Sequence, residues 1–245
     1  MRPKTSWQLV FILILTVAVA GSASGRAKAE RSAADGAVKF FDAGTRKAFG
    51  NRQNELAKHR TPTTLRGPDG NYRITTCAEL LRLVNSGLSL EQTEVDRVFS
   101  EYQICLVIAA LDRAQAPRVS YFDHRALGTD FLKRLNLATL QSSLYPRAQS
   151  PKDGFTFSDF KFSSVQVSPR SLTIEDEDWN YAVVALAAAD CDGDGIEDLV
   201  VNFYDDAKTG AYFQIATLIL SRVKPKGWIT AAGPLRTGPN TGTRN

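Results

Sequence analysis

The C-terminal half of the chain carries a series of apolar segments, and this series constrains the fold most. Three strand-length runs, 181–189, 199–204 and 211–220, contain no charged residue, and turn residues separate them. Shorter segments before them alternate apolar with polar side chains, at 160–162, 165–167 and 171–175. Strands joined by short turns pair with their sequence neighbours, so the pattern predicts a meander of about five antiparallel strands over residues 151–228.

The region 38–150 has a different pattern and is expected to be mainly helical. Thr76 and Glu79 form a capping-box sequence, and Ser89 with Gln92 repeats it after Gly87. Apolar side chains then recur every three to four residues, at Val95, Val98, Phe99, Tyr102, Cys105, Leu106 and Ala109. The turn residues of 61–72 predict a loop. The predicted fold class is α+β: a helical N-terminal part followed by an antiparallel β-meander that carries one calcium-type loop.

Three cysteines, Cys77, Cys105 and Cys191, allow one disulfide and leave one thiol. Two helices joined as a hairpin would bring Cys77 close to Cys105, whereas Cys191 lies inside an acidic loop. We therefore predict a Cys77–Cys105 disulfide. The alternative is that Cys77 is a reactive thiol whose pKa is lowered by the N-terminus of its helix.

The first residues predict export. Arg2 and Lys4 precede an apolar run, and small residues follow at 18–23, as in a secretory signal peptide over residues 1–20. The alternative is a membrane anchor, for which the apolar run is short. We expect a flexible lead-in at 21–37, a disordered tail at 229–245, a periplasmic or secreted location, and no membrane span after signal cleavage.

Charge and motifs limit the function. The net charge of +4 falls to +2 when Arg2 and Lys4 are removed, which argues against a nucleic-acid partner. The chain has only two histidines, His59 and His124, and lacks the nucleophile-elbow, P-loop and dinucleotide-binding motifs. The sequence therefore favours a protein that is not an enzyme, with no catalytic residue assigned.

One loop has the composition of a metal site. In the acidic loop, residues 190–198, carboxylates stand at Asp190, Asp192, Asp194 and Asp198, and glycines at 193 and 195 allow a tight wrap. Ca²⁺ takes six to eight hard oxygen ligands. We predict Ca²⁺ coordination by these four aspartates and by the Ile196 carbonyl, with water completing the shell. The alternative is an acidic hairpin turn that holds no ion.

The segment 189–201 resembles the D-x-D-G-D-G-x-x-D-hydrophobic signature of FG-GAP/VCBS (integrin-alpha-type) repeats. The resemblance is local and covers a single copy. It implies a Ca²⁺ loop between two strands, but not a propeller, which needs four or more blades. Val201 stands where an EF-hand has its bidentate glutamate, so the resemblance to that motif is weaker.

The function expected from the sequence is that of an exported calcium-binding structural or binding module. One alternative is a secreted hydrolase with an unfamiliar site, in which His124 would lie near a carboxylate and a hydroxyl. Another is an envelope or adhesion protein that docks an extracellular partner through the bound calcium.

Overall fold

The computed structural model describes residues 36–90, 97–140, 142–144 and 154–232. The predicted signal peptide and the lead-in up to residue 35 lie outside these ranges. So does Gln92, the last residue of the second capping sequence. Within the described ranges, no helix combines the length and the apolar character that a bilayer crossing requires.

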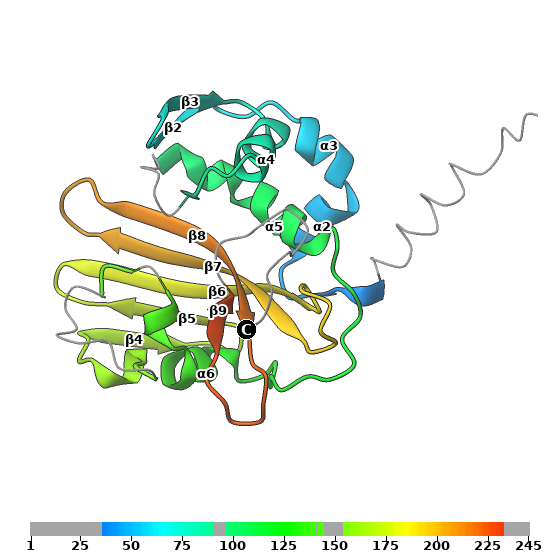
Figure 1. Ribbon diagram of the computed structural model, residues 1–245. Coiled ribbons are helices and arrows are strands. Elements are labelled where there is room, and N and C mark those ends of the chain that lie inside the picture. Colours follow the sequence, from blue (N-terminus) through cyan, green and yellow to red (C-terminus); the bar gives the residue numbers. More distant parts are fainter. Residues whose placement is uncertain (1–35, 91–96, 141, 145–153, 233–245) are drawn as a thin grey trace, which may run out of the picture.

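An antiparallel sheet forms the centre of the molecule (Figure 1). Six of its strands follow one another in chain order: β4 (Ser164–Val167), β5 (Ser171–Glu175), β6 (Trp179–Ala189), β7 (Asp198–Ala207), β8 (Phe213–Ser221) and β9 (Thr230–Ala232). The predicted meander is thus confirmed, although 160–162 is not a strand. The mixture of helices with an antiparallel sheet agrees with the predicted α+β class.

A seventh strand, β1 (Lys39–Phe40), joins the sheet beside β6. β6 pairs with β5 through residues 180–184 and with β1 through residues 187–188. The change of partner coincides with an irregularity between Ala185 and Ala187, where the Leu186 carbonyl accepts the Phe41 amide at 2.9 Å. One edge of β6 therefore serves two partners in succession.

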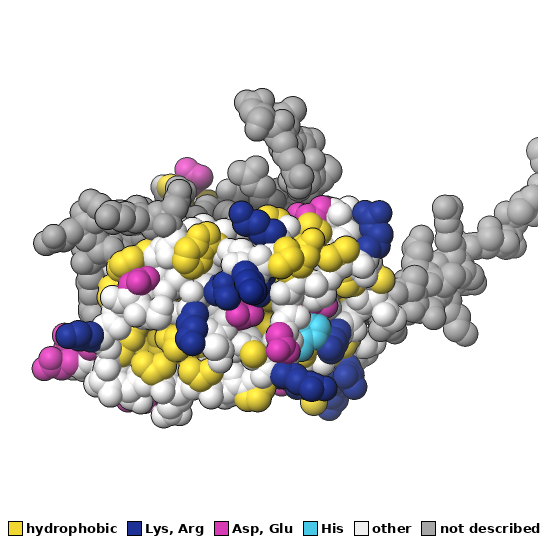
Figure 2. Space-filling model, turned by 90° about the horizontal axis from the view of Figure 1, so that it is seen from below, with side chains coloured by type: hydrophobic (Ala, Val, Ile, Leu, Met, Phe, Trp, Pro, Cys, Tyr) yellow, Lys and Arg dark blue, Asp and Glu magenta, His cyan; other side chains and the backbone are white. Residues whose placement is uncertain are grey.

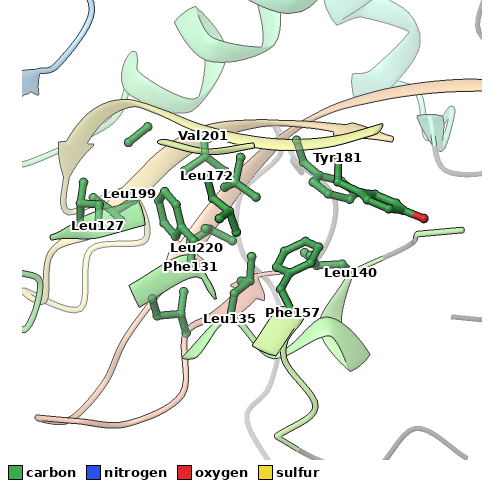
Figure 3. Packing of buried hydrophobic residues seen from close by; sticks show 14 of the residues in the cluster. Leu127, Phe131, Leu135, Leu140, Phe157, Leu172, Tyr181, Leu199, Val201 and Leu220 are labelled. Carbon is green, nitrogen blue, oxygen red and sulfur yellow. The ribbon is translucent and has the colours of Figure 1, made fainter. Parts of the chain in front are cut away.

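Helices cover both faces of the sheet, which explains why its central strands are apolar on both sides. In β7, Leu199 and Val201 contribute to one core, while Val200 contributes to the other. The first face carries α6 (Leu127–Arg134), η3 (Leu137–Thr139) and η5 (Phe157–Asp159). Figure 3 shows Phe131, Leu135 and Phe157 from this layer among sheet residues such as Leu172 and Leu220.

The second face carries most of the helices (Figure 1). They are α2 (Ala43–Gly50), α3 (Arg52–Ala57), α4 (Cys77–Asn85), η2 (Arg97–Tyr102) and α5 (Gln103–Leu111). The hairpin of β2 (Thr63–Gly67) and β3 (Gly70–Ile74) packs with them. The described part of 38–150 thus holds five α-helices, but also β1, β2 and β3, so it is not purely helical.

The predicted capping box and disulfide are both present. The Thr76 hydroxyl accepts the Glu79 amide at 3.2 Å, and the Glu79 carboxylate accepts the Thr76 amide at 3.1 Å. Cys77 and Cys105 are fully buried and disulfide-bonded, with their Cα atoms 5.2 Å apart. The bond joins the first turn of α4 to α5.

Three expectations need correction. Residues 61–72, expected as a loop, form most of the β2–β3 hairpin, because Leu65 and Ile74 are buried against the helices and the Pro68-Asp69-Gly70 turn joins strands. The expected disordered tail begins too early. Ile229 is fully buried and β9 pairs with β8, so residues 229–232 are part of the fold, and 233–245 lie outside the described ranges. Residues 36–37, the end of the expected flexible lead-in, are helical.

Candidate metal site

The acidic loop joins β6 to β7 at one end of the sheet. A second segment, residues 115–124, runs beside it and is called the strap below. The strap leads from α5 on one face of the sheet towards α6 on the other, passing the β6–β7 turn on the way (Figure 1). The acidic loop therefore lies where the two helical layers are connected.

Three carboxylates of the acidic loop converge. Asp190, Asp192 and Asp194 each contribute one oxygen to a group whose members all lie within 4.8 Å of one another. Asp190 is buried, with 3% of its surface exposed, whereas Asp192 and Asp194 are exposed. The cluster thus has one side within the protein and one side open to solvent, and it could hold a metal ion.

Backbone amides fix the Asp190 carboxylate in place. Its Oδ1 accepts the Gly193 amide at 2.7 Å, and its Oδ2 accepts the Gly195 amide at 2.8 Å. Both glycines adopt positive φ angles, 84° and 85°, which confirms the prediction that the tight wrap requires them. The loop backbone therefore wraps around Asp190, so its carboxylate is pre-positioned.

The other two carboxylates are held by amides two residues further along. Asp192 accepts the Asp194 amide at 3.1 Å, and Asp194 accepts the Ile196 amide at 2.7 Å. These contacts are typical of Asx turns. The same bonds place Ile196, whose carbonyl the sequence predicts as a ligand, at the end of the wrap.

Asp198, the fourth predicted side-chain ligand, lies outside this cluster. Its carboxylate is buried and accepts the Cys191 amide at 3.0 Å and the Ser221 hydroxyl. Burial raises the pKa of Asp198 to about 6, and the charges of Asp192 and Asp194 contribute to the rise. In this geometry Asp198 closes the base of the loop and ties it to β8.

A positively charged side chain, that of Arg118, lies beside the acidic loop. The Arg118 guanidinium contacts the Asp194 carbonyl at 3.4 Å and lies against Gly195, where an added Cβ would be 2.4 Å from its Nη2 atom. Gly195 therefore meets two requirements, a positive φ and a close approach by the strap. Arg118 offsets part of the negative charge on one side of the loop.

The third cysteine is a free thiol. Cys191 is half-buried within the acidic loop. Burial raises the pKa of its thiol far above the ordinary value, and the neighbouring carboxylates of Asp198, Asp190 and Asp192 raise it further. Because the thiolate is the reactive form, the raised pKa disfavours reaction of Cys191.

Glu197 is a functional candidate that the sequence did not single out. It is 5% exposed, and its Oε2 atom accepts both the Ser120 hydroxyl and Nε2 of His124, the latter at 2.8 Å. Nδ1 of His124 contacts the Lys39 ammonium, which can only donate, so Nε2 carries the proton that bonds to Glu197. Glu197 faces the strap, whereas the three clustered aspartates face one another. The clustered aspartates are spaced two residues apart, and Glu197 falls outside this spacing. This difference in spacing is the sequence signal that could have separated Glu197 from the cluster.

A second polar cluster surrounds Asp205 on β7. Its carboxylate is fully buried and accepts the Ser143 amide at 2.5 Å, the Ser143 hydroxyl at 2.7 Å and the Ser142 hydroxyl at 3.2 Å. The Ser143 hydroxyl also contacts Tyr181 at 3.0 Å. Burial raises the pKa of Asp205, although these hydrogen bonds oppose the rise. The cluster fixes residues 142–144 to the sheet.

On the face that Figure 2 shows, no patch among the described residues consists of charged side chains of one sign alone. Basic, acidic and apolar side chains of the described residues are interspersed there, not gathered by sign. This distribution matches the small net charge of +4 of the whole chain.

Chemically, three carboxylates with one open side are suited to a hard cation, because such ions prefer oxygen ligands and keep some water. Comparisons of the chain with protein-family models, with curated proteins and with solved structures gave no match.

Proposed function

We propose that this protein is an exported calcium-binding module with a structural or binding role. The observation that carries the proposal is the convergence of Asp190, Asp192 and Asp194 on a loop whose own amides hold the carboxylates in place. Clustered carboxylates repel one another unless a cation offsets their charge. A bound cation would therefore stabilise a conformation that the loop already adopts.

The donor set supports Ca²⁺. All three side chains offer oxygen only, which disfavours the softer metals that select sulfur or imidazole. Ca²⁺ tolerates irregular geometry and accepts both carbonyl and water ligands, whereas Mg²⁺ demands a near-ideal octahedron. The open side at Asp192 and Asp194 leaves room for water. The local resemblance to FG-GAP/VCBS repeats supports the same ion.

A structural role follows from the position of the loop. The loop joins β6 to β7, and the strap pairs with it, so an ion there would stabilise a junction between sheet and helices. The signal-like sequence at 1–20 supports export, and the disulfide is compatible with it, since disulfides persist mainly in oxidising compartments. Extracellular calcium modules function with millimolar affinity.

Calcium titration of the purified protein tests the proposal. After treatment with EDTA and removal of the chelator, we expect calorimetry to detect one site, and millimolar Ca²⁺ to raise the melting temperature. Asp192→Asn removes one cluster carboxylate and should abolish both effects. Asp69→Asn makes the same change in the exposed β2–β3 turn and should leave both effects intact.

Native mass spectrometry provides the decisive contrary outcome. If the wild-type protein remains metal-free and its melting temperature is unchanged in 10 mM Ca²⁺, a concentration well above that required for millimolar sites, the loop is an acidic turn and the proposal fails.

One observation favours a second candidate function, that of a secreted hydrolase. His124, the Glu197 carboxylate and the Ser120 hydroxyl lie together, with Glu197 buried and Ser120 exposed. A carboxylate that accepts a serine hydroxyl directly could act as its general base. The candidate ranks second because the hydroxyl bonds to Glu197 and not to the imidazole, unlike the arrangement in a Ser-His-Asp triad.

A fluorophosphonate probe, which reacts covalently with activated serines, separates the two functions. A hydrolase should be labelled at Ser120 in the wild-type protein and should not be labelled in Ser120→Ala. Peptide mapping by mass spectrometry locates the label. An unlabelled wild-type protein would eliminate the hydrolase and leave the calcium module.

A further inference from the structure

We propose that docking of the strap regulates the cation affinity of the acidic loop, so that the strap and the loop form one cooperative unit. The inference rests on the proposed function, because it concerns the same site, and it adds a regulatory element outside the loop. It is carried by contacts between residues 115–124 and residues 190–197.

Two residues of the loop serve both the cluster and the strap. Gly195 donates its amide to Oδ2 of Asp190, and its carbonyl accepts the amides of Arg118, at 2.8 Å, and Val119, at 3.1 Å. Asp190 contributes its carboxylate to the cluster, while its backbone exchanges hydrogen bonds of 2.8 and 3.0 Å with Gln115. Gly195 therefore contributes its amide to the cluster and its carbonyl to the strap, and Asp190 contributes its side chain to the cluster and its backbone to the strap.

Glu197 adds a side-chain attachment at the far end of the strap. Its amide donates to the Val119 carbonyl at 2.8 Å, and its buried carboxylate binds Ser120 and His124. His124 in turn contacts Lys39 in β1. The strap is thus bonded to the loop at both of its ends and in between.

Thermodynamic reciprocity then fixes the direction of the effect. If the ion stabilises the wrapped loop, it also stabilises the docked strap, and loosening the strap must weaken ion binding by the same factor. The coupling does not require a large movement, since a shift of Gly195 alone alters both the Asp190 contact and the strap contact. A partner, substitution or cleavage that detaches the strap would therefore lower the affinity of the loop for the ion.

The test uses an uncharged change outside the loop. Ser120→Ala removes one hydroxyl from Glu197 without altering the charge around the cluster. We expect it to weaken Ca²⁺ binding about fivefold or more, the lower end of typical coupling factors. Ser86→Ala, which removes an exposed hydroxyl at the end of α4, should leave the affinity unchanged.

Hydrogen exchange of the wild-type protein supplies a readout that does not depend on a variant. Saturating Ca²⁺ should slow exchange of the Gln115, Arg118 and Val119 amides, with a smaller change in the distant β2–β3 hairpin. If calorimetry shows Ca²⁺ binding but strap exchange and the Ser120→Ala affinity do not change, the coupling is wrong and the calcium module stands. If calorimetry shows no binding, the proposed function fails, and the coupling fails with it.

Discussion

Replacing both Cys77 and Cys105 with alanine is expected to lower the melting temperature by about 10 °C. The disulfide closes a loop over a sequence separation of 28 residues, and the chain-entropy model assigns such a cross-link about 3.5 kcal/mol. For a chain of this size, each kcal/mol shifts the melting temperature by about 2–4 °C. Both sulfur atoms are also buried, so their removal loses packing between α4 and α5. Thermal unfolding followed by circular dichroism measures the change.

The free cysteine supplies the control. Cys191→Ala removes a thiol that forms no cross-link, so it should retain most of the wild-type stability. Adding a reducing agent to the wild-type protein should destabilise it in the same direction as the double substitution. A double variant that melts within about 2 °C of the wild type, less than the shift assigned to 1 kcal/mol, would show that the cross-link contributes no stability.

Asp205→Ala should destabilise the protein by about 3 kcal/mol at pH 4. The substitution leaves the Ser143 amide and the hydroxyls of Ser142 and Ser143 without their acceptor, and buried donors that lose a partner cost about 1–3 kcal/mol each. Denaturant unfolding measures the free-energy difference. The matched control is Asp178→Ala, which removes an exposed acid from the turn before β6.

The destabilisation should depend on pH in a defined direction. Burial raises the folded-state pKa of Asp205, so the folded chain binds this proton more tightly than the unfolded chain, whose pKa is about 3.9. The stability that this proton contributes is complete below the unfolded pKa and is lost as the pH rises through the folded pKa. The advantage of the wild type over Asp205→Ala should therefore be larger at pH 4 than at pH 7.5. An advantage that grows with pH would contradict the assigned shift.

The sheet was predictable because its pattern is local. Strand-length apolar runs with turns between them indicate antiparallel neighbours, and β5, β6, β7 and β8 follow this rule. The β2–β3 hairpin was missed because its strands, at 63–67 and 70–74, are short and polar on their exposed side, so the Pro and Gly residues dominated the pattern. β9 was missed because three residues carry no detectable periodicity.

The candidate site was predictable only where its partners are close in sequence. Asp190, Asp192 and Asp194 belong to one turn, and the glycines indicate how that turn wraps. Asp198 has the spacing of a ligand, but its hydroxyl partner, Ser221, comes from the next strand of the sheet. The side-chain partners of Glu197, Ser120 and His124, lie more than 70 residues away, and the two serine partners of Asp205 lie more than 60 residues away. Only the tertiary fold brings such groups together.

The change of partner along β6 has a consequence for solubility. Residues 181–189 lack charge, proline and glycine, which is the composition that favours cross-β aggregation. β7 pairs with one edge of this segment, while β5 and then β1 pair with the other. Without β1, the backbone of Ala187 and Ala188 would be an unprotected edge on which another chain could add. A strand of two residues thus completes the protection of a long apolar segment that could otherwise self-associate.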